Sequence, residues 1–232
     1  MKKITSLLIL LAIFISCFKV NAYCLQISKT ENKTVYITFD DGPNSNTTKI
    51  LDLLNKYDMK ATFFLLENKI NLYPEVVTRI LNEGHSIGLH GQSHEKAVFY
   101  ANDTSVLSEI SNTKNTLLDK FGYDTKLVRV PYGSKPHLTK AQYSSLINSG
   151  YKIWDWNIDS TDTYQNANVS SIVNNTLDKL NQYENSVILF HEKQITVSSL
   201  PTILDYIKNN NYESKIITEN QVPMNWWNRN LN

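Results

Sequence analysis

The chain has 232 residues, with 23 lysines and arginines against 22 aspartates and glutamates, and 41% of its residues are hydrophobic. This length and composition suit one globular domain with a full apolar core. The near balance of charge is not typical of proteins that bind nucleic acid or an anionic membrane, so we expect neither partner. We further expect a monomer.

The N-terminus has the pattern of a secretory signal peptide. Met1-Lys2-Lys3 is basic, and residues 7–18 form an apolar run that is too short to span a bilayer. Val20-Asn21-Ala22 fits the small-x-small rule for cleavage. We therefore predict a signal peptide over residues 1–22, one domain over residues 23–232, and a protein that is secreted to the extracellular space or the cell wall.

Cleavage after Ala22 would leave 210 residues, with 20 basic against 22 acidic side chains and a net charge of −2. Only Cys24 would remain of the two cysteines, so the mature chain has no internal disulfide and must fold by packing alone. Two alternatives to a cleaved signal peptide stay open. One is an uncleaved membrane anchor, and the other is a lipoprotein modified at Cys17.

From residue 35 onward, β-rich and amphipathic runs alternate along the chain. The strand-like runs are 35–39, 61–65, 86–89, 126–130, 151–154, 186–190 and 214–217. The helix-like runs are 47–57, 74–82, 105–121, 139–149, 169–182 and 198–209, and Ser198 or Ser199 would cap the last of them. This alternation predicts an α/β fold with a parallel sheet covered by helices, and periodicity leaves open whether the sheet closes into a barrel.

Polar side chains cluster where these predicted strands end. The clusters are Asp40 with Asp41, His90 with His94, Arg129 to Tyr132, Asp159, and His191. In parallel α/β folds the carboxyl ends of the strands share one edge, and active sites are built there. Five polar clusters on that edge predict a catalytic site.

Asp40 and Asp41 follow an apolar strand, and two adjacent carboxylates are costly to bury unless they are paired or bound to a metal. Neighbouring residues of a strand point to opposite faces, so both acids can serve one site only if the strand ends there. Gly42-Pro43 would supply the turn. The alternative is an ordinary turn with two solvated acids.

His90 and His94 are spaced so that both rings could face one ion from a helical turn. With Asp41 they would form a set of two histidines and one carboxylate. Three protein ligands leave positions open for water and substrate, which is typical of a catalytic metal site. The alternative is that the two histidines are structural.

Arg129 ends a strand beside these acids and would be a natural bidentate partner for a carboxylate, or else part of an ordinary ion pair. His191 also ends a strand. A histidine that is backed by a carboxylate is a tuned acid or base, although a histidine at a strand end can also have no role.

Together these motifs resemble those of the polysaccharide deacetylases, the NodB-like family 4 of the carbohydrate esterases. The matching segments, in order, are Thr38–Pro43 for TFDDGP, His90–His94 for H-x-x-x-H, Arg129–Tyr132 for R-x-P-Y, Asp159–Asp162 for the start of D-x-x-D-W, and Leu189–His191 for L-x-H. The resemblance covers essentially the whole predicted mature chain. Thr163 stands where the family has Trp, which puts the substrate pocket in doubt but not the chemistry.

The resemblance implies a distorted (β/α) barrel and a role for each matched residue. Asp41, His90 and His94 would hold a divalent metal, with zinc expected and cobalt or nickel possible. Asp40 would be the general base held by Arg129, and His191 the general acid oriented by Asp159. The substrate side would be formed by the backbone N–H of Tyr132, by Leu189 against the acetyl methyl, and by Pro131 and Trp156.

The implied activity is metal-dependent removal of N-acetyl groups from a polysaccharide. Peptidoglycan is the substrate we expect first, and chitin-type N-acetylglucosamine second. An O-acetyl esterase acting on a xylan-like polysaccharide is the alternative within enzymes, because the same centre would attack an ester more easily than an amide. A non-catalytic carbohydrate-binding protein is disfavoured, because metal binding alone would not require Asp40 and His191.

Overall fold

The structure is a computed structural model that describes residues 33–228. The predicted signal peptide over residues 1–22 and the first residues of the predicted domain lie outside the described residues. Within residues 33–228, no helix combines the length and the apolar character needed to cross a bilayer.

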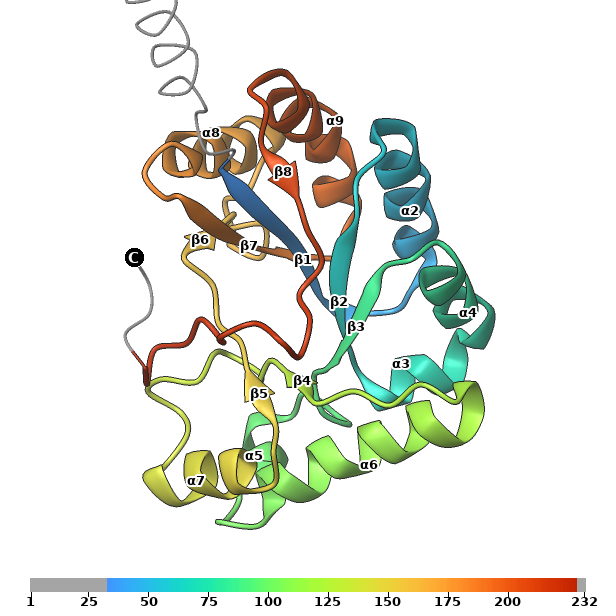
Figure 1. The fold of residues 1–232 in the computed structure, drawn as a ribbon, viewed down its shortest axis with the longest axis vertical. Helices are drawn as coiled ribbons and strands as arrows, with labels where there is room; N and C mark the ends of the chain where they lie inside the picture. The colour runs from blue at the N-terminus through green and yellow to red at the C-terminus, as the bar shows by residue number, and fades with distance from the viewer. Residues whose placement is uncertain (1–32, 229–232) are drawn as a thin grey trace, which may run out of the picture. The chain divides into compact units, whose positions relative to one another are not determined.

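The strands form one curled, open parallel sheet (Figure 1). They are β1 (Thr34–Gly42), β2 (Ala61–Leu65), β3 (Ser86–Leu89), β4 (Leu127–Val128), β5 (Lys152–Ile153), β6 (Ile158–Asp159), β7 (Asn185–His191) and β8 (Glu213–Ser214). Their order is β5-β4-β3-β2-β1-β7-β6, with β8 beside the start of β1. Since no ladder joins β5 to β6 among the described residues, the sheet is a half-barrel. This confirms the predicted distorted (β/α) barrel.

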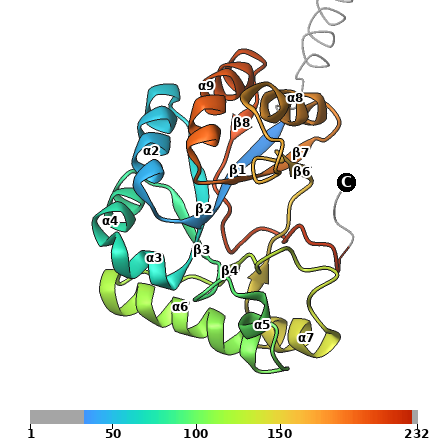
Figure 2. The ribbon, with the colours of Figure 1, turned by 180° about the vertical axis from the view of Figure 1, so that it is seen from behind.

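Helices surround the sheet on its outer side (Figures 1 and 2). They are α2 (Ser45–Tyr57), α3 (Glu67–Leu72), α4 (Pro74–Asn82), α5 (Lys96–Phe99), α6 (Ser105–Phe121), α7 (Lys140–Asn148), α8 (Val169–Leu180) and α9 (Gln194–Asn209). Helices α4 and α6 have the predicted bounds. The short α3, α5 and β6 were not predicted, because elements of two to six residues carry too little periodicity.

Helix α9 begins at Gln194, so the predicted start with a cap at Ser198 or Ser199 is wrong. The first turn contains β-branched residues of modest helix propensity. One of them, Thr196, is buried, and its hydroxyl donates a hydrogen bond of 2.6 Å to Asp162. A tertiary contact therefore overrides the local preference.

Alternate residues of each strand build two separate apolar clusters, one on each face of the sheet. Towards the helices, the Phe39 ring stacks on Phe63 at 5.2 Å and on Phe190 at 5.7 Å. On the concave face, Phe64 and Val187 pack with other side chains of the second cluster. The helix-facing cluster supplies most of the core, and the concave face is left for a smaller core and the polar site.

The C-terminal segment, residues 215–228, covers the concave side between β5 and β6 (Figure 1). Ile217 and Met224 of this segment join the concave apolar cluster. The carbonyl of Met224 accepts the N–H of Asp155 at 2.8 Å, and the Asn225 amide donates to the carbonyl of Ile153 at 3.1 Å. The segment therefore occupies the place where the barrel fails to close.

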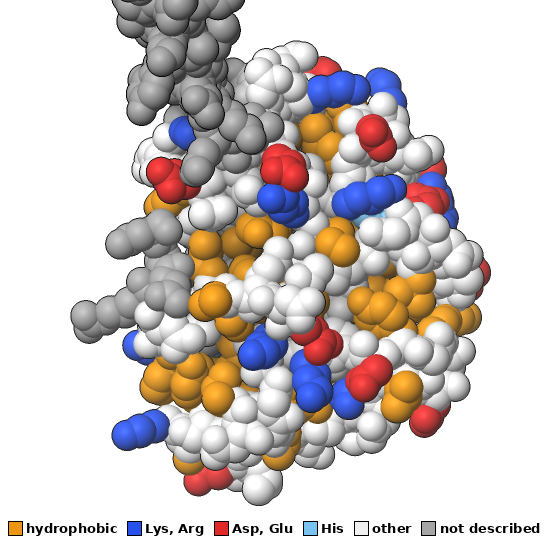
Figure 3. Space-filling view, in the orientation of Figure 1, with side chains coloured by type: hydrophobic (Ala, Val, Ile, Leu, Met, Phe, Trp, Pro, Cys, Tyr) orange, Lys and Arg blue, Asp and Glu red, His pale blue; other side chains and the backbone are white. Residues whose placement is uncertain are grey.

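On the face drawn in Figure 3, lysines and arginines stand next to acidic side chains, with apolar groups between them. This mixture matches the near balance of 23 basic and 22 acidic residues. Such a surface provides little long-range steering of a charged partner.

Replacing Gly88 by Ala is expected to destabilise the protein by about 1–3 kcal/mol, the usual range for overpacking a core. Gly88 of β3 lies in register with Phe64 of β2. A Cβ at this position would lie 2.4 Å from two carbons of the Phe64 ring. The ring cannot retreat freely, because the guanidinium carbon of Arg129 lies 4.3 Å from its centre. Urea unfolding at equilibrium measures the change.

A double-mutant cycle provides the control for this prediction. Phe64→Leu opens space beside Gly88, so Gly88→Ala should cost less in the Phe64→Leu background than in the wild type. A Gly88→Ala protein whose free energy of unfolding stays within about 0.5 kcal/mol of the wild type would contradict the packing argument.

Candidate active site

The two adjacent acids reach one site through a bulge in β1 rather than through the end of the strand. Strand β1 continues to Gly42, and its pairing with β2 shifts register between Asp40 and Gly42. Asp41, the extra residue, has a φ of 71°. A bulge of this kind re-aims one side chain without ending the strand. The expectation that the strand ends at these acids is therefore wrong, although both carboxylates do lie at one site.

Glu192 fills the space behind this bulge. Its carboxylate accepts a hydrogen bond from the hydroxyl of Thr47 and lies against Gly42, where a Cβ would overlap it. Burial raises the pKa of Glu192 to about 8, although the Thr47 hydrogen bond opposes the shift. Only glycine leaves room for this carboxyl group, which explains the residue that follows the two acids.

Three ligand atoms converge beside the bulge. Asp41 Oδ1 lies 3.3 Å from Nε2 of His90 and 3.4 Å from Nε2 of His94. Two atoms at ~2.1 Å from a tetrahedral ion lie ~3.4 Å apart, so these separations fit a zinc-sized ion. Asp41 Oδ1 is buried and accepts no hydrogen bond among the described residues. An orphaned carboxylate oxygen between two imidazoles fits a site for a cation.

Neighbouring groups set the protonation states that His90 and Asp41 need to bind a metal ion. His90 Nδ1 lies 2.6 Å from the carbonyl of Arg129, a contact that places the proton on Nδ1 and leaves the Nε2 lone pair free. Burial alone would raise the pKa of Asp41. Its close contact with His90 and the nearby imidazoles of His94 and His191 instead hold that pKa well below the ordinary value. The carboxylate is therefore ionised at neutral pH.

The segment that joins the two histidines is not helical, so the predicted helical turn is wrong. Gly91 and His94 have positive φ angles of 95° and 60°. The N–H groups of Gln92 and Ser93 donate to the carboxylate of Glu109 instead of to preceding carbonyls. The rings of His90 and His94 nevertheless lie 5.2 Å apart, because the bent segment brings both to the same side.

Arg129 is fully buried and holds Asp40 through one nitrogen. Its Nη1 donates to Asp40 Oδ1 at 3.0 Å and to Thr38 Oγ1 at 2.6 Å. Its Nε and Nη2 donate to the carbonyls of Trp154 and Asp155. The bidentate contact expected from the sequence is therefore wrong, because the other donors are used by backbone carbonyls. This arrangement leaves Asp40 Oδ2 facing the metal ligands, 3.8 Å from His90 Nε2.

Asp162, not Asp159, holds His191. Asp162 Oδ1 lies 2.8 Å from His191 Nδ1, and Asp162 Oδ2 accepts the backbone N–H of His191 at 2.7 Å. Asp159 instead accepts the N–H of Thr161 at 2.7 Å. Thr161 has a φ of 62°, and this turn carries Asp162 back onto the end of β7. The only sequence signal for Asp162 was its place as the second acid of the same motif.

The charge of this pair follows from its contacts. Burial alone would lower the pKa of His191, but the hydrogen bond and charge of Asp162, together with Asp40 and Asp41, raise it to about 9. His191 Nε2 lies 4.0 Å from Asp41 Oδ2, so the ring faces the three ligand atoms. The ring is therefore a proton donor at neutral pH.

The residues expected on the substrate side border the same centre. Tyr132 has a φ of 65° and is 47% exposed, and its hydroxyl donates to the carbonyl of His94 at 3.1 Å. Its own N–H donates to no acceptor among the described residues. The carbonyl of the preceding Pro131 accepts the Tyr100 hydroxyl at 2.6 Å. Leu189 lies two residues before His191 on β7 and is nearly buried.

Trp156 lies behind Arg129, 5.7 Å from the guanidinium carbon, and packs edge-on against Trp226 at 4.8 Å. The carboxylate of Asp155 links the turn at Ser134 to the C-terminal segment at Trp226. It accepts the N–H and hydroxyl of Ser134 at 2.8 and 2.5 Å, and the N–H of Trp226 at 2.9 Å. No motif in the sequence indicated that the C-terminal segment supports the turn that carries Tyr132.

This edge thus combines an Asp–His–His set, a carboxylate held by a buried arginine, and a histidine held by a second carboxylate. Such a combination is typical of an enzyme that uses one metal ion for hydrolysis. Residues 27–151 match the family model described as polysaccharide deacetylase. A putative polysaccharide deacetylase of Bacillus subtilis, YheN, is 42% identical over 197 residues, which are 83% of this chain and 70% of that one.

Two further comparisons agree. A peptidoglycan-N-acetylglucosamine deacetylase of Bacillus cereus is 34% identical over 86% of this chain and 75% of its own. The crystal structure of the polysaccharide deacetylase Bc1974 from Bacillus cereus superposes with a TM-score of 0.80 at 34% identity, covering 86% of this chain and 99% of that one. The chain belongs to the polysaccharide deacetylase family. The resemblance found in the motifs is confirmed, and polysaccharide deacetylase activity follows from it.

Proposed function

We propose that the protein is a metal-dependent N-deacetylase of an N-acetylglucosamine polysaccharide, with peptidoglycan as the first substrate and chitin-type chains as the second. The observation that carries the proposal is the convergence of Asp41, His90 and His94 between Asp40 and the charged His191. A similar Bacillus cereus protein is named for deacetylating peptidoglycan N-acetylglucosamine, which supports this choice of polymer. We also propose that it acts as a secreted or cell-wall-associated monomer.

Asp41 Oδ1 and the Nε2 atoms of His90 and His94 would hold the ion. Mixed oxygen and nitrogen donors suit zinc, and cobalt or nickel could substitute. When bound, such an ion polarises the acetyl carbonyl and acidifies water, whose pKa falls from ~15.7 to ~7 in the best zinc enzymes.

The protein's own groups complete the reaction. Asp40 Oδ2 takes the proton of the attacking water, and Arg129 fixes the orientation of this carboxylate from the other side. The free N–H of Tyr132 donates to the oxyanion, and one such donor is typically worth ~3 kcal/mol. Leu189 packs against the acetyl methyl.

His191 is the general acid in this scheme. Its ring carries a proton at neutral pH, because Asp162 stabilises the charged form. The proton passes from Nε2 to the leaving nitrogen as the C–N bond breaks. Water and the acetamide are thus converted to acetate and a free amino sugar.

Acetate release tests the proposal. The protein should release acetate from peptidoglycan and from N-acetylglucosamine oligomers, and mass spectrometry should find free amino sugars in the digested peptidoglycan. A chelator should abolish the release, and added Zn²⁺ or Co²⁺ should restore it. Full activity in a verified metal-free sample would refute the metal dependence. Release from acetylated xylan alone would replace the N-deacetylase proposal with an O-acetyl esterase.

A further inference from the structure

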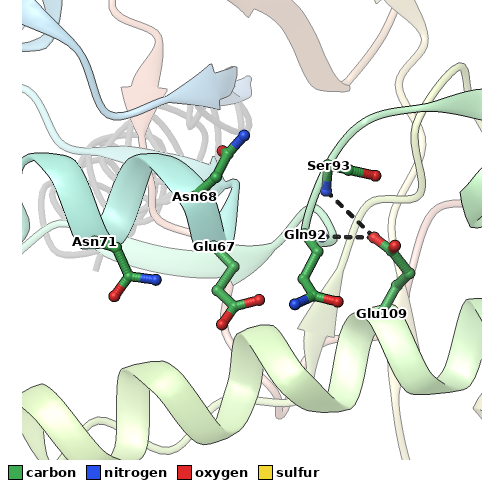
Figure 4. Close-up of a pocket in the computed structure, with 6 residues that line it drawn as sticks. All are labelled: Glu67, Asn68, Asn71, Gln92, Ser93 and Glu109. Carbon is green, nitrogen blue, oxygen red and sulfur yellow. Dashed lines mark hydrogen bonds between the residues drawn. The ribbon is translucent and has the colours of Figure 1, made fainter.

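Glu109 of α6 holds the segment between the two histidines in place (Figure 4). Its side chain is buried, with the residue 6% exposed, and Oε2 accepts the N–H of Gln92 at 2.8 Å and of Ser93 at 3.3 Å. Glu109 comes from a different part of the chain, and within residues 33–228 its carboxylate makes no hydrogen bond to the side chain of His90 or His94. It therefore acts on the backbone that connects His90 to His94.

The backbone of this segment needs such a partner. Successive N–H groups in a turn with left-handed residues form a concave pair that binds an anion, and Gly91 and His94 are the left-handed residues here. Without an acceptor, two part-buried N–H groups would lose their hydrogen bonds, which is unfavourable for polar groups shielded from water. The segment would then relax towards another conformation, and His94 would leave Asp41.

Packing fixes the other side of the segment. A Cβ on Gly91 would lie 2.7 Å from the Phe99 ring and 3.4 Å from Glu109 Oε2. At Gly91 the segment thus packs directly against α5 and α6. Tertiary contacts set its position, and not local helix formation. They include the Glu109 carboxylate, the Phe99 ring and the N–H of Glu67, which donates to the carbonyl of Gly91 at 3.0 Å.

We propose that Glu109 is a positioning residue that sets the affinity of the Asp41–His90–His94 site for its metal ion. This inference rests on the proposed metal dependence and deepens it. The groups that orient metal ligands from outside are worth 10–100-fold in affinity. Glu109 orients the two histidines through the backbone N–H groups of Gln92 and Ser93, to which its carboxylate is hydrogen-bonded.

The same region offers a matched control. Glu109 borders a polar pocket of about 400 Å³, lined also by Glu67, Asn68, Asn71, Gln92 and Ser93 (Figure 4). Glu67 carries the same charge at this pocket, but its carboxylate accepts the hydroxyl of Thr116 at 2.8 Å and not the N–H groups of the segment. Neutralising Glu67 therefore changes the local charge without removing the support of the histidines.

The test measures Zn²⁺ affinity directly, by competition with a chromophoric chelator at pH 7.5. Glu109→Ala should weaken binding 10–100-fold. Glu109→Gln keeps an acceptor oxygen but loses the charge, so its loss should be smaller, about fivefold. Glu67→Gln should stay within about twofold of the wild type. At saturating Zn²⁺, the kcat of Glu109→Gln should return close to the wild-type value.

Thermal unfolding of the metal-free proteins separates positioning from simple destabilisation. If Glu109→Gln lowers Tm but binds Zn²⁺ as tightly as the wild type, Glu109 is only a structural residue and the inference is overturned. If Glu109→Ala does not fold, the Zn²⁺ affinity of Glu109→Gln alone tests the inference. A folded wild-type protein that binds no Zn²⁺ would refute the metal site itself. If Glu67→Gln weakened Zn²⁺ binding as much as Glu109→Gln does, only the role of Glu109 would be refuted.

Discussion

Replacing Asp40 by Asn is expected to lower kcat by about 10²–10⁴-fold while one metal ion stays bound, since positioned general bases usually contribute that factor. Asp40 Oδ1 is held by Arg129, and Oδ2 faces the ligand atoms without being one of the three that converge. The substitution nearly keeps the size of the side chain and removes its basicity. Kinetics of acetate release at saturating metal, with metal content measured on the same sample, test this.

The neighbouring acid supplies the control. Asp41→Asn should lose metal and activity together, because Asp41 Oδ1 is the atom that lies between the two imidazoles. The two variants differ by one residue in position and carry the same chemical change. If Asp40→Asn retained more than about a tenth of the wild-type rate, Asp40 would not be the general base.

Asp162→Asn is expected to move the alkaline limb of kcat/KM to lower pH, by about 1–3 pH units, and to reduce the maximal rate. His191 must be protonated when the amine leaves, and its pKa is raised to about 9, chiefly by Asp162 against the opposing effect of burial. Activity should therefore fall as the pH rises through that value. Without the Asp162 charge, burial would dominate and His191 would lose its proton at lower pH.

Asp159→Asn is the matched control for this second prediction. Asp159 caps its own turn through the N–H of Thr161 and does not contact His191, so the alkaline limb should stay in place. The pH profiles of wild type and both variants, at saturating metal, make the comparison. If the alkaline limb does not move in Asp162→Asn, it reflects titration of the attacking water or of the metal ligands. His191 would then not be the general acid.

The sequence by itself determined the architecture and the edge that carries the site. Strands β2 and β3 and helices α4 and α6 have their predicted bounds, because the strands are short β-rich runs and the helices have a clear period of 3.6 residues. Parallel strands must share one carboxyl edge, so five polar clusters at predicted strand ends were enough to bring Asp40, Asp41, His90, Arg129 and His191 together. The resemblance of the motifs also placed the chain in its family.

The tertiary structure decided which groups touch within that edge. The choice of Asp162 over Asp159 depends on a left-handed residue at Thr161, and the use of both Asp40 and Asp41 depends on a bulge with a left-handed Asp41. The placement of His94 depends on Glu109, which lies fifteen residues further along the chain on α6. A periodic pattern records the face of an element but not single backbone reversals or distant hydrogen bonds, because their energies come from contacts that exist only after the chain has folded.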